Sequence, residues 1–215
     1  MPQEISVRKF KPGDRESVRD ITYNNAFLGE PAGAFFEGQE IVSDALTLYF
    51  TDYEPQSSFV AEADKEVVGC LIGAKDKIAS EKIIQNKIMP ALFWRVFVSG
   101  ALFRKKNFIF LLQCLLSAAK GEFSMPQVAK VYPATLHINI KKEFHGLDIG
   151  SRLIAAYLDY LKEEGVCGVH LATMSEGAAQ FFSKQGFQLW YKGRRSYFRH
   201  ILRRAVPLYI YAKKL

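Results

Sequence analysis

Two periodicities in the order of apolar and polar residues predict strands and helices along the chain. Apolar residues alternate with polar ones over residues 136–140, as in a strand with one buried face, and recur at helical spacing over 149–161. Weaker patterns predict further strands at 5–10, 58–61, 67–73, 166–172, 187–191 and 207–212, and helices after residue 14 and over 39–50 and 177–185. Strands and helices that mix around one sheet indicate a single α/β (α+β) domain over residues 1–215.

A helical insertion is expected at residues 78–121, where the pattern changes character. From Ile83 to Ala119 there is no acidic residue, although basic residues occur among dense apolar ones. The periodicity predicts two or three helices, with breaks near Pro90 and near residues 105–107. The longest nearly uncharged run, residues 108–119, is shorter than the roughly 20 residues that cross a bilayer, so no transmembrane span is expected. Burial against the domain, a lid over a functional site, a subunit interface such as that of a homodimer, and contact with an anionic membrane surface all stay open.

The positive charge is concentrated toward the C-terminal end. The net charge is +7, yet no acidic residue follows Glu176 and nine basic residues do. A second insertion, residues 192–205, holds most of them, and the spacing of Arg195, Arg199 and Arg203 predicts one helical face of arginines. Such a face could bind an anionic ligand, a membrane or nucleic-acid phosphates, or could simply be solvated. Sequence-specific reading of nucleic acid is not expected, because no recognised nucleic-acid-binding module is present.

The cysteines and the first residues of the chain indicate in which cellular compartment we expect the protein. Cys70, Cys114 and Cys167 each lie in an apolar run and are far apart in sequence, which is typical neither of a disulfide framework nor of a metal site. We therefore expect three small core residues, no bound metal, and a reducing compartment, the cytoplasm. Residues 1–14 are polar and strand-like, without the apolar segment of a secretory signal.

The turn between the strand at 136–140 and the helix at 149–161 is a candidate phosphate-binding site. The first turn of a helix has free backbone N–H groups and the positive end of the helix dipole. Gly146 and Gly150 leave room for a pyrophosphate to approach these donors, and Ser151 adds a hydroxyl. A plain strand-to-helix turn has the same appearance, so the turn alone is a weak signal.

Together with the segment from Ala178 to Phe187, this turn resembles the GNAT superfamily of acyl-CoA-dependent N-acetyltransferases. The family's motifs read Gln/Arg-x-x-Gly-x-Gly/Ala at the turn and Asn-x-x-Ala-x-x-Phe-Tyr-x-x-x-Gly-Phe after the next strand. The segment from Tyr132 to Asn139 is similar to a subgroup related to the acetyltransferase-like domain of eukaryotic O-GlcNAcases. The resemblance covers residues 132–187. It implies a mixed, mostly antiparallel central sheet flanked by helices, with acetyl-CoA as co-substrate, and the minimal fold has no counterpart of the insertion at 78–121.

The resemblance also implies which residues bind the cofactor. In the family, the end of the central strand binds the pantetheine arm, and the amides of the turn bind the pyrophosphate. Carried over to this chain, the cofactor-binding residues are Ile138, Ile140, Lys142, His145, Gly146, Asp148, Ile149, Gly150, Ser151, Ser175 and Phe182.

Four of these residues depart from the family's pattern. His145 replaces Gln or Arg and still offers a donor, and Ser175 replaces Asn. Asp148 replaces the second glycine. As an N-cap it would satisfy one of the free amides, and its carboxylate would oppose a phosphate unless it points into solvent. Phe182 replaces the tyrosine that acts in the family as general acid on the departing thiolate.

The reaction that the resemblance implies is direct attack of an amine on the acetyl thioester within a ternary complex. A lysine-type amine has a pKa near ~10.4, so a base or desolvation must help it lose a proton. His137 is the first candidate for this base or for a substrate contact, since histidine titrates in the useful range, and a structural histidine is the alternative. Tyr191 and Tyr197 are candidate acids, with aromatic packing as the alternative. Asn139, Glu30 and Glu37 are candidates for binding the acceptor, which is a small-molecule or a protein amine, and either glutamate could simply be exposed.

Two other functions stay open at this stage. The departures at residues 148, 175 and 182 are also typical of a catalytically weak acetyl-CoA-binding domain with a regulatory or interaction role. The acid-free segments 83–119 and 177–215 are also typical of a peripheral membrane or polyanion-binding protein.

Overall fold

A seven-stranded sheet forms the centre of the computed structural model, which describes residues 4–124 and 126–215. The strands lie in the order β1-β2-β3-β4-β5-β7-β6. Their bounds are Ile5–Lys9 (β1), Phe59–Ala63 (β2), Glu66–Ala74 (β3), Ala134–Ile140 (β4), Gly168–Thr173 (β5), Gln188–Arg195 (β6) and Val206–Lys214 (β7). All neighbouring pairs are antiparallel except β4 and β5, which run parallel. The expectation of a mixed, mostly antiparallel sheet is therefore confirmed.

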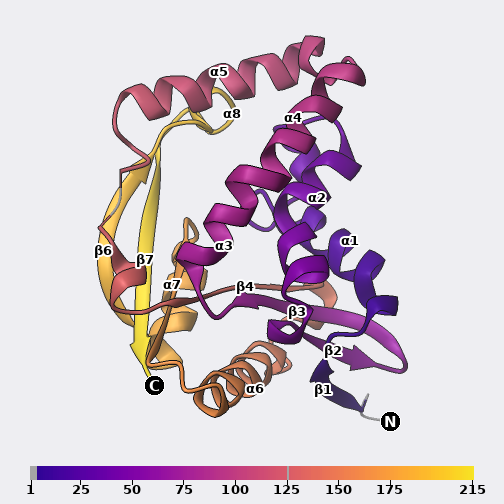
Figure 1. Cartoon of the computed structure of the whole chain (residues 1–215), viewed down its shortest axis with the longest axis vertical. Helices are drawn as coiled ribbons and strands as arrows, with labels where there is room; N and C mark the ends of the chain where they lie inside the picture. The colour runs from indigo at the N-terminus through magenta and orange to yellow at the C-terminus, as the bar shows by residue number, and fades with distance from the viewer. Residues whose placement is uncertain (1–3, 125) are drawn as a thin grey trace.

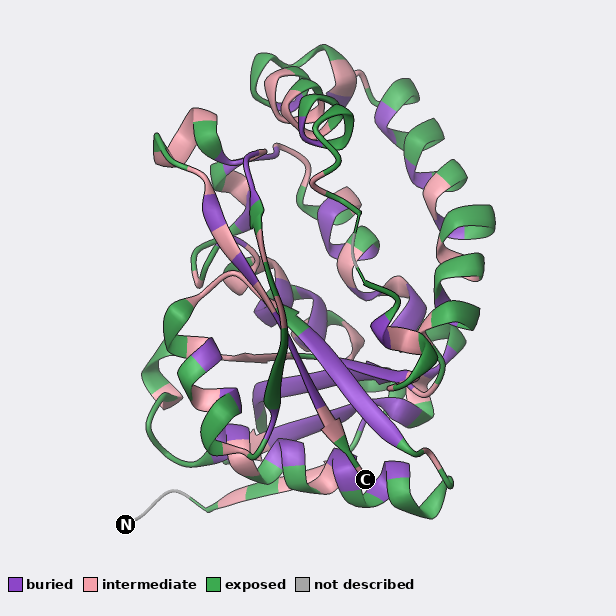
Figure 2. Cartoon of the chain, turned by 90° about the vertical axis from the view of Figure 1, so that its left-hand side faces the viewer, coloured by how far each residue is buried: buried purple, intermediate pink, exposed green. Residues whose placement is uncertain are grey.

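Helices cover both faces of this sheet (Figure 1). One face packs against α6 (Ile149–Glu163) and α7 (Glu176–Lys184). The opposite face of β2, β3 and β4 packs against α1 (Arg15–Asn25) and the segment that follows α2 (Gln39–Leu48). Figure 2 shows that the buried residues follow the sheet and the helix faces turned toward it. The helices predicted after residue 14 and over 39–50, 149–161 and 177–185 are all present.

The contact between α6 and the sheet is centred on Tyr157, whose side chain is fully buried. Its hydroxyl donates a hydrogen bond of 2.8 Å to the carbonyl oxygen of Thr135 and lies 3.2 Å from that of Ala74. The ring lies directly against Gly73 of β3, where an added Cβ would stand 2.5 Å from it. Glycine is therefore required at this position for α6 to reach the sheet.

The insertion predicted at 78–121 is helical in the structure. It contains α3 (Lys77–Ile83), α4 (Met89–Val98) and α5 (Lys105–Ala119). α3 and α4 form one column that rises toward the end of the molecule, and α5 crosses that end (Figure 1).

The breaks between these helices differ from the prediction. Pro90 does not interrupt the column, because a π-helical turn at residues 84–88 joins α3 to α4. Proline lacks an N–H and crowds the carbonyl four residues earlier, and the wider turn before it accommodates both effects. The true break lies at Gly100, which has a φ of 68°, whereas residues 105–107 form the first turn of α5.

The predicted helical face of arginines in the insertion at 192–205 is not formed. Residues 192–195 continue β6 and pair with β7, and only Arg199–Leu202 is helical (α8). Arg195 is buried and donates a hydrogen bond to the carbonyl oxygen of Glu122. Arg203 follows α8 with a φ of 60°. Pairing with β7 outweighs the helical spacing, because the hairpin satisfies the backbone of these residues.

The prediction of three small core cysteines is correct for Cys70 alone. Cys114 is half-buried, and Cys167 is exposed because the pairing of β5 with β7 begins only at the next residue. No helix among residues 4–124 and 126–215 is long and apolar enough to cross a membrane. Over the same residues, no group of three or more His, Cys, Asp or Glu side chains is placed to hold a metal ion.

We expect Gly73→Ala to lower the free energy of unfolding by about 1–3 kcal/mol, because the added methyl group would displace the ring of Tyr157. Urea denaturation at neutral pH measures this change. Gly13→Ala is the matched control: nothing lies within 4 Å of its added Cβ. Its stability should therefore stay within about 0.5 kcal/mol of the parent. Equal stability of the two variants would contradict the packing role of Gly73.

Candidate functional site

β4 and β5 diverge at the centre of the sheet. Among the described residues these parallel strands pair at only two positions, Ala134 with Val169 and Thr135 with His170. Beyond them, β4 continues to Ile140 while it pairs with β3. The edge of β4 that faces β5 therefore presents backbone N–H and C=O groups without a strand partner. A ligand that contains amide groups can bind such an edge as an added strand does.

The open edge of β4 leads directly into the turn before α6. After a short 3₁₀ turn at Lys142–Phe144, Gly146 has a φ of 81° and α6 begins at Ile149. The first N–H groups of a helix have no partner inside it. Gly146 is exposed, and an added Cβ there would have nothing within 4 Å, so the space around this residue is open. The turn thus combines free donors, space and the positive end of a helix, which a phosphate group requires.

Asp148 lies at the N-cap position of α6, but its side chain accepts no hydrogen bond from the first turn. The predicted capping role is therefore wrong. A capping side chain requires an extended backbone, whereas Asp148 has φ 57° and ψ 13°, in the left-handed region. Glycine adopts this region freely, and aspartate tolerates it better than most residues. Because Asp148 is exposed and leaves the amides unoccupied, they stay available to a ligand.

Gly150 and Ser151 join α6 to α7. A Cβ at Gly150 would lie 2.9 Å from Cζ of Phe181 in α7, so helix packing by itself favours glycine here. The hydroxyl of Ser151 accepts a hydrogen bond of 2.9 Å from Nε2 of Gln185. The side chain of Ile149 is buried in the core, so only its backbone can face a ligand.

Ser175 and Phe182 serve the structure of α7. The hydroxyl of Ser175 accepts a hydrogen bond of 3.3 Å from the N–H of Ala178 and so caps the helix. Phe182 is buried and packs edge to face against Phe181 and Phe187. Both side chains therefore have a structural role, and their contact with a cofactor stays a prediction.

His137 is accessible to solvent although protein surrounds it. More than a third of the residue is exposed, and its ring lies 5.7 Å from that of Phe50. Desolvation by the surrounding protein, together with the positive charge of Lys77 and the neighbouring His170, lowers the pKa of His137 to about 4. The expectation that His137 titrates near neutral pH is wrong, because it is uncharged and only weakly basic there.

The remaining predicted residues lie in three separate places. Asn139 lies on the same face of β4 as His137 and is half-buried. Glu30 forms an ion pair of 2.7 Å with Lys142, which joins the loop after α1 to the turn before α6. Tyr191 packs in a small cluster against β7 that does not include His137.

An aromatic cluster, which the sequence reasoning missed, connects both insertions to the end of β5. Its rings come from the loop after α1, from α5 and from the segment before α8, and their centroids lie 4.7 to 6.0 Å apart. Its central members are Phe27, Phe35, Phe110 and Phe198. Beside it, the hydroxyl of Tyr197 donates a hydrogen bond of 3.5 Å to Sδ of Met174, directly after β5, and burial raises the pKa of Tyr197 to about 12. In the sequence, the signal that could have indicated this cluster is a pair of adjacent aromatic residues at 35–36 and another at 197–198.

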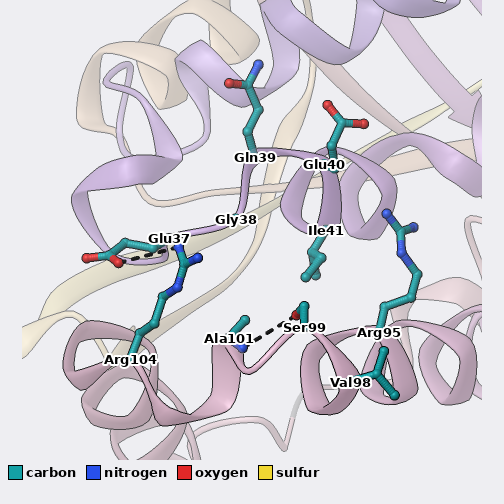
Figure 3. A pocket seen from close by; sticks show the side chains of 10 residues that line it. All are labelled: Glu37, Gly38, Gln39, Glu40, Ile41, Arg95, Val98, Ser99, Ala101 and Arg104. Carbon is teal, nitrogen blue, oxygen red and sulfur yellow. Dashed lines mark hydrogen bonds and ion pairs between the residues drawn. The ribbon is translucent and has the colours of Figure 1, made fainter.

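A cavity of about 440 Å³ lies apart from β4 and the turn before α6. It is between the start of α2 and the connection from α4 to α5 (Figure 3). Arg104 and Glu37 reach toward each other there and form an ion pair of 3.6 Å. Among the predicted site residues, Glu37 lines this cavity and the others lie elsewhere. The cavity is therefore not the site toward which the sequence points.

No protein-family model matches the chain, and no curated protein matches it in sequence. Solved structures do match its fold. The crystal structure of SsHAT has a TM-score of 0.73 at 21% identity, over 98% of each chain. A polyamine N-acetyltransferase of Drosophila melanogaster that forms N-acetylagmatine has a TM-score of 0.62 at 16% identity, over 99% of this chain and 100% of the other. The fold is that of the GNAT N-acetyltransferases.

The same GNAT fold occurs in yncA of Salmonella typhimurium, which was solved with its cofactor acetyl-CoA. Its TM-score is 0.56 at 12% identity, over 98% of this chain and 94% of the other. Identities this low establish the architecture alone, and one fold can support several chemistries. The activity of this GNAT fold therefore has to be argued from its own residues.

We expect His137 to make the protein less stable in mild acid. Its folded-state pKa of about 4 lies below the value of 6.5 for a free ring, so between these pH values the unfolded chain binds more protons. The stability that His137 confers is complete above pH 6.5 and is lost as the pH falls toward 4. His137→Gln should therefore lose less stability between pH 7 and pH 5 than the parent, as measured by urea midpoints. Asn139→Ala changes a side chain on the same strand face that carries no titrating group. It should therefore shift the urea midpoint by the same amount at pH 7 and at pH 5. The same loss in the parent and in His137→Gln would refute the desolvation of the ring.

Proposed function

We propose that this chain is an acetyl-CoA-dependent N-acetyltransferase. The observation that carries the proposal is the continuous path from the open edge of β4 into the free amides before α6. The amide groups of a pantetheine arm can pair with an open strand edge, and a pyrophosphate needs clustered N–H donors. The GNAT fold, which the chain shares with several acetyltransferases, supports the same assignment.

In this proposal, the strand end and the turn bind different parts of acetyl-CoA. The backbone of residues 138–140 binds the pantetheine arm, and the N–H groups of residues 149–151 bind the pyrophosphate. Lys142 and His145 are exposed at the turn, where both can donate to phosphate oxygens. Nε2 of His145 lies 3.1 Å from the carbonyl oxygen of Ile140, so this ring stands at the junction of the two binding segments.

The reaction requires an uncharged amine nitrogen to attack the carbonyl carbon of the thioester. A C–N bond forms, the C–S bond breaks with its electron pair going to sulfur, the nitrogen loses one proton and the sulfur gains one. With a pKa of about 4, His137 accepts a hydrogen bond at neutral pH but is a poor acceptor of the proton itself. We therefore assign it to orienting the amine, with the proton leaving to solvent. Tyr191 is not retained as the acid, and water protonates the thiolate, since a thiol pKa near ~8.5 makes it a stable leaving group.

The acceptor amine approaches, in this proposal, from the face of β4 that carries His137 and Asn139. Two of the similar structures are described as acetyltransferases of polyamines or of agmatine, so small cationic amines are the first acceptors to test. Glu30, a candidate contact for such a cation, is paired with Lys142. A cationic acceptor that uses Glu30 therefore has to displace this lysine.

Binding and turnover together test the proposed function. Calorimetry should detect binding of acetyl-CoA and of CoA. Thiol release should exceed background with at least one acceptor from a panel of agmatine, polyamines, amino acids, amino sugars and peptides with free amines. Binding without thiol release for any amine would favour a cofactor-binding domain without catalysis, an alternative motivated by the buried Phe182 in place of tyrosine. Absence of binding would exclude both functions.

We expect Asp148→Gly to tighten acetyl-CoA binding about two- to fivefold, because a charge at a helix N-terminus is worth about 0.3–1 kcal/mol. Asp148→Asn, which removes the charge and keeps a side chain suited to the left-handed backbone, should give a similar gain. Asp159→Asn is the matched control: it removes an exposed charge from the same helix about 16 Å farther along its axis and should leave the affinity unchanged. Calorimetry in low-salt buffer measures all three. No change in either Asp148 variant would mean that the carboxylate does not act on the phosphates.

A further inference from the structure

α5 has its apolar side turned outward. Its buried residues, Asn107 and Ser117, are polar, whereas Phe108, Leu112 and Leu115 are exposed. These three lie three and four positions apart and so form one stripe along the helix. A surface helix of a globular protein normally has the opposite arrangement, with its apolar stripe toward the core.

The inward side of α5 is held by the ring of Phe110, which packs in the aromatic cluster, and by polar contacts near both ends of the helix. The side-chain amide of Asn107 donates to the carbonyl oxygens of Glu37 and Ala101, at 2.8 and 2.9 Å, and accepts from the N–H of Glu37 at 2.6 Å. At the other end, the hydroxyl of Ser117 donates to the carboxylate of Glu122. These contacts fix the rotation of α5 about its axis, so its apolar stripe stays on the surface.

α4 adds a second exposed apolar face. Phe93, Trp94 and Phe97 are each more than half exposed, whereas Leu92 and Val96 of the same helix face the core. Residues 99–104 connect α4 to α5 at one end of the molecule (Figure 1). Phe103 in this connection is 77% exposed. We call this region the α4–α5 surface and define it by Trp94, Phe97, Phe103, Phe108, Leu112 and Leu115.

The α4–α5 surface belongs to a segment with basic and no acidic residues. No Asp or Glu occurs from Ile83 to Ala119. Lys87 and Lys105 are exposed and form no ion pair within residues 4–124 and 126–215, and Lys105 continues the outward stripe of α5 one turn before Phe108. Exposed Trp, Phe and Leu side chains beside lysines match a bilayer interface, where apolar groups enter the acyl boundary and lysines meet anionic headgroups.

We propose that the α4–α5 surface docks the protein onto an anionic lipid bilayer, lying on it without crossing it. A second copy of the chain is a poorer occupant, because a symmetric contact would bring two basic segments together with no acidic residue in either. Anionic headgroups supply the missing negative charge. The proposal is independent of acetyl transfer, since none of these residues belongs to the β4–α6 site.

The two tryptophans of the chain give a direct test, because only Trp94 lies on the α4–α5 surface. Trp190, on β6, packs edge to face with Tyr132. In Trp190→Phe, the emission of Trp94 should shift to shorter wavelength when vesicles of phosphatidylcholine and phosphatidylserine are added. In Trp94→Phe, the emission of Trp190 should stay unchanged. A shift confined to Trp190, or no shift in either variant, overturns the proposal.

Vesicle sedimentation tests the surface by substitution. Phe108→Ser combined with Leu115→Ser should lower the partition coefficient at least about tenfold, because two large apolar side chains leave the acyl boundary. The matched control, Val131→Ser with Leu189→Ser, removes two apolar side chains of 51% exposure elsewhere and should bind as the parent does. Binding of the parent should weaken as salt is added and should be weak to phosphatidylcholine alone.

Three results would overturn the proposal. One is equal loss of binding in both double variants, and another is binding that neither variant changes. The third is a lipid-free dimer, seen by analytical ultracentrifugation, that Phe108→Ser with Leu115→Ser dissociates, since the surface would then be a subunit interface. Thermal melting of both double variants establishes that each is folded, as expected for changes at exposed positions.

Discussion

The divergence of β4 and β5 is the constraint on which the rest of the structure depends. Each strand is held by its outer neighbour: β4 by β3 along most of its length and β5 by β7 along all of it. The two can therefore separate after Thr135 and His170 without either losing its place in the sheet. α6 packs against β1 to β4 from one side, and the hydroxyl of Tyr157 ties it to Thr135, the last residue of β4 that pairs with β5. A rigid frame thus surrounds an edge whose backbone groups are left for a ligand.

Residues of the turn before α6 contribute to packing as well as to the proposed binding site, so each departure from the GNAT motif has to be judged on both. The ring of Phe181 favours glycine at residue 150, whatever is bound at the turn. Asp148 adopts a left-handed backbone that suits glycine, yet it leaves the helix amides free and is exposed. We therefore expect its effect on a bound anion to be electrostatic and modest. Phe182 lies inside the core, where its ring packs without a hydroxyl group.

The two insertions are attached to the sheet and its helices mainly through aromatic rings and polar side chains. Phe110 of α5 joins the aromatic cluster with Phe35 and Phe198, while polar side chains hold the helix near both ends. A few aromatic rings and satisfied amides position α5 without burying its leucines. As a result, the outer side of α5 exposes apolar and basic side chains, although its inner side is held to the domain.

The sequence by itself determined the elements whose signals are local. The alternation over 136–140, the glycines of the turn and the helical repeat over 149–161 specify β4, the turn and α6, because neighbours along the chain make these structures. The strands predicted at 58–61 and 67–73, which correspond to β2 and β3, are likewise specified by their local pattern. Tertiary structure decided whatever depends on distant partners. The spacing of Arg195, Arg199 and Arg203 is helical, but pairing with β7 draws Arg195 into a strand. His137 has an ordinary place in a strand pattern, but its pKa is set by the protein packed around it. The pattern of α5 marks an apolar side, yet the contacts of Asn107 and Phe110 with distant segments, and that of Ser117 with Glu122, turn that side toward solvent. The sequence of a helix does not state which of its faces the neighbouring segments will contact.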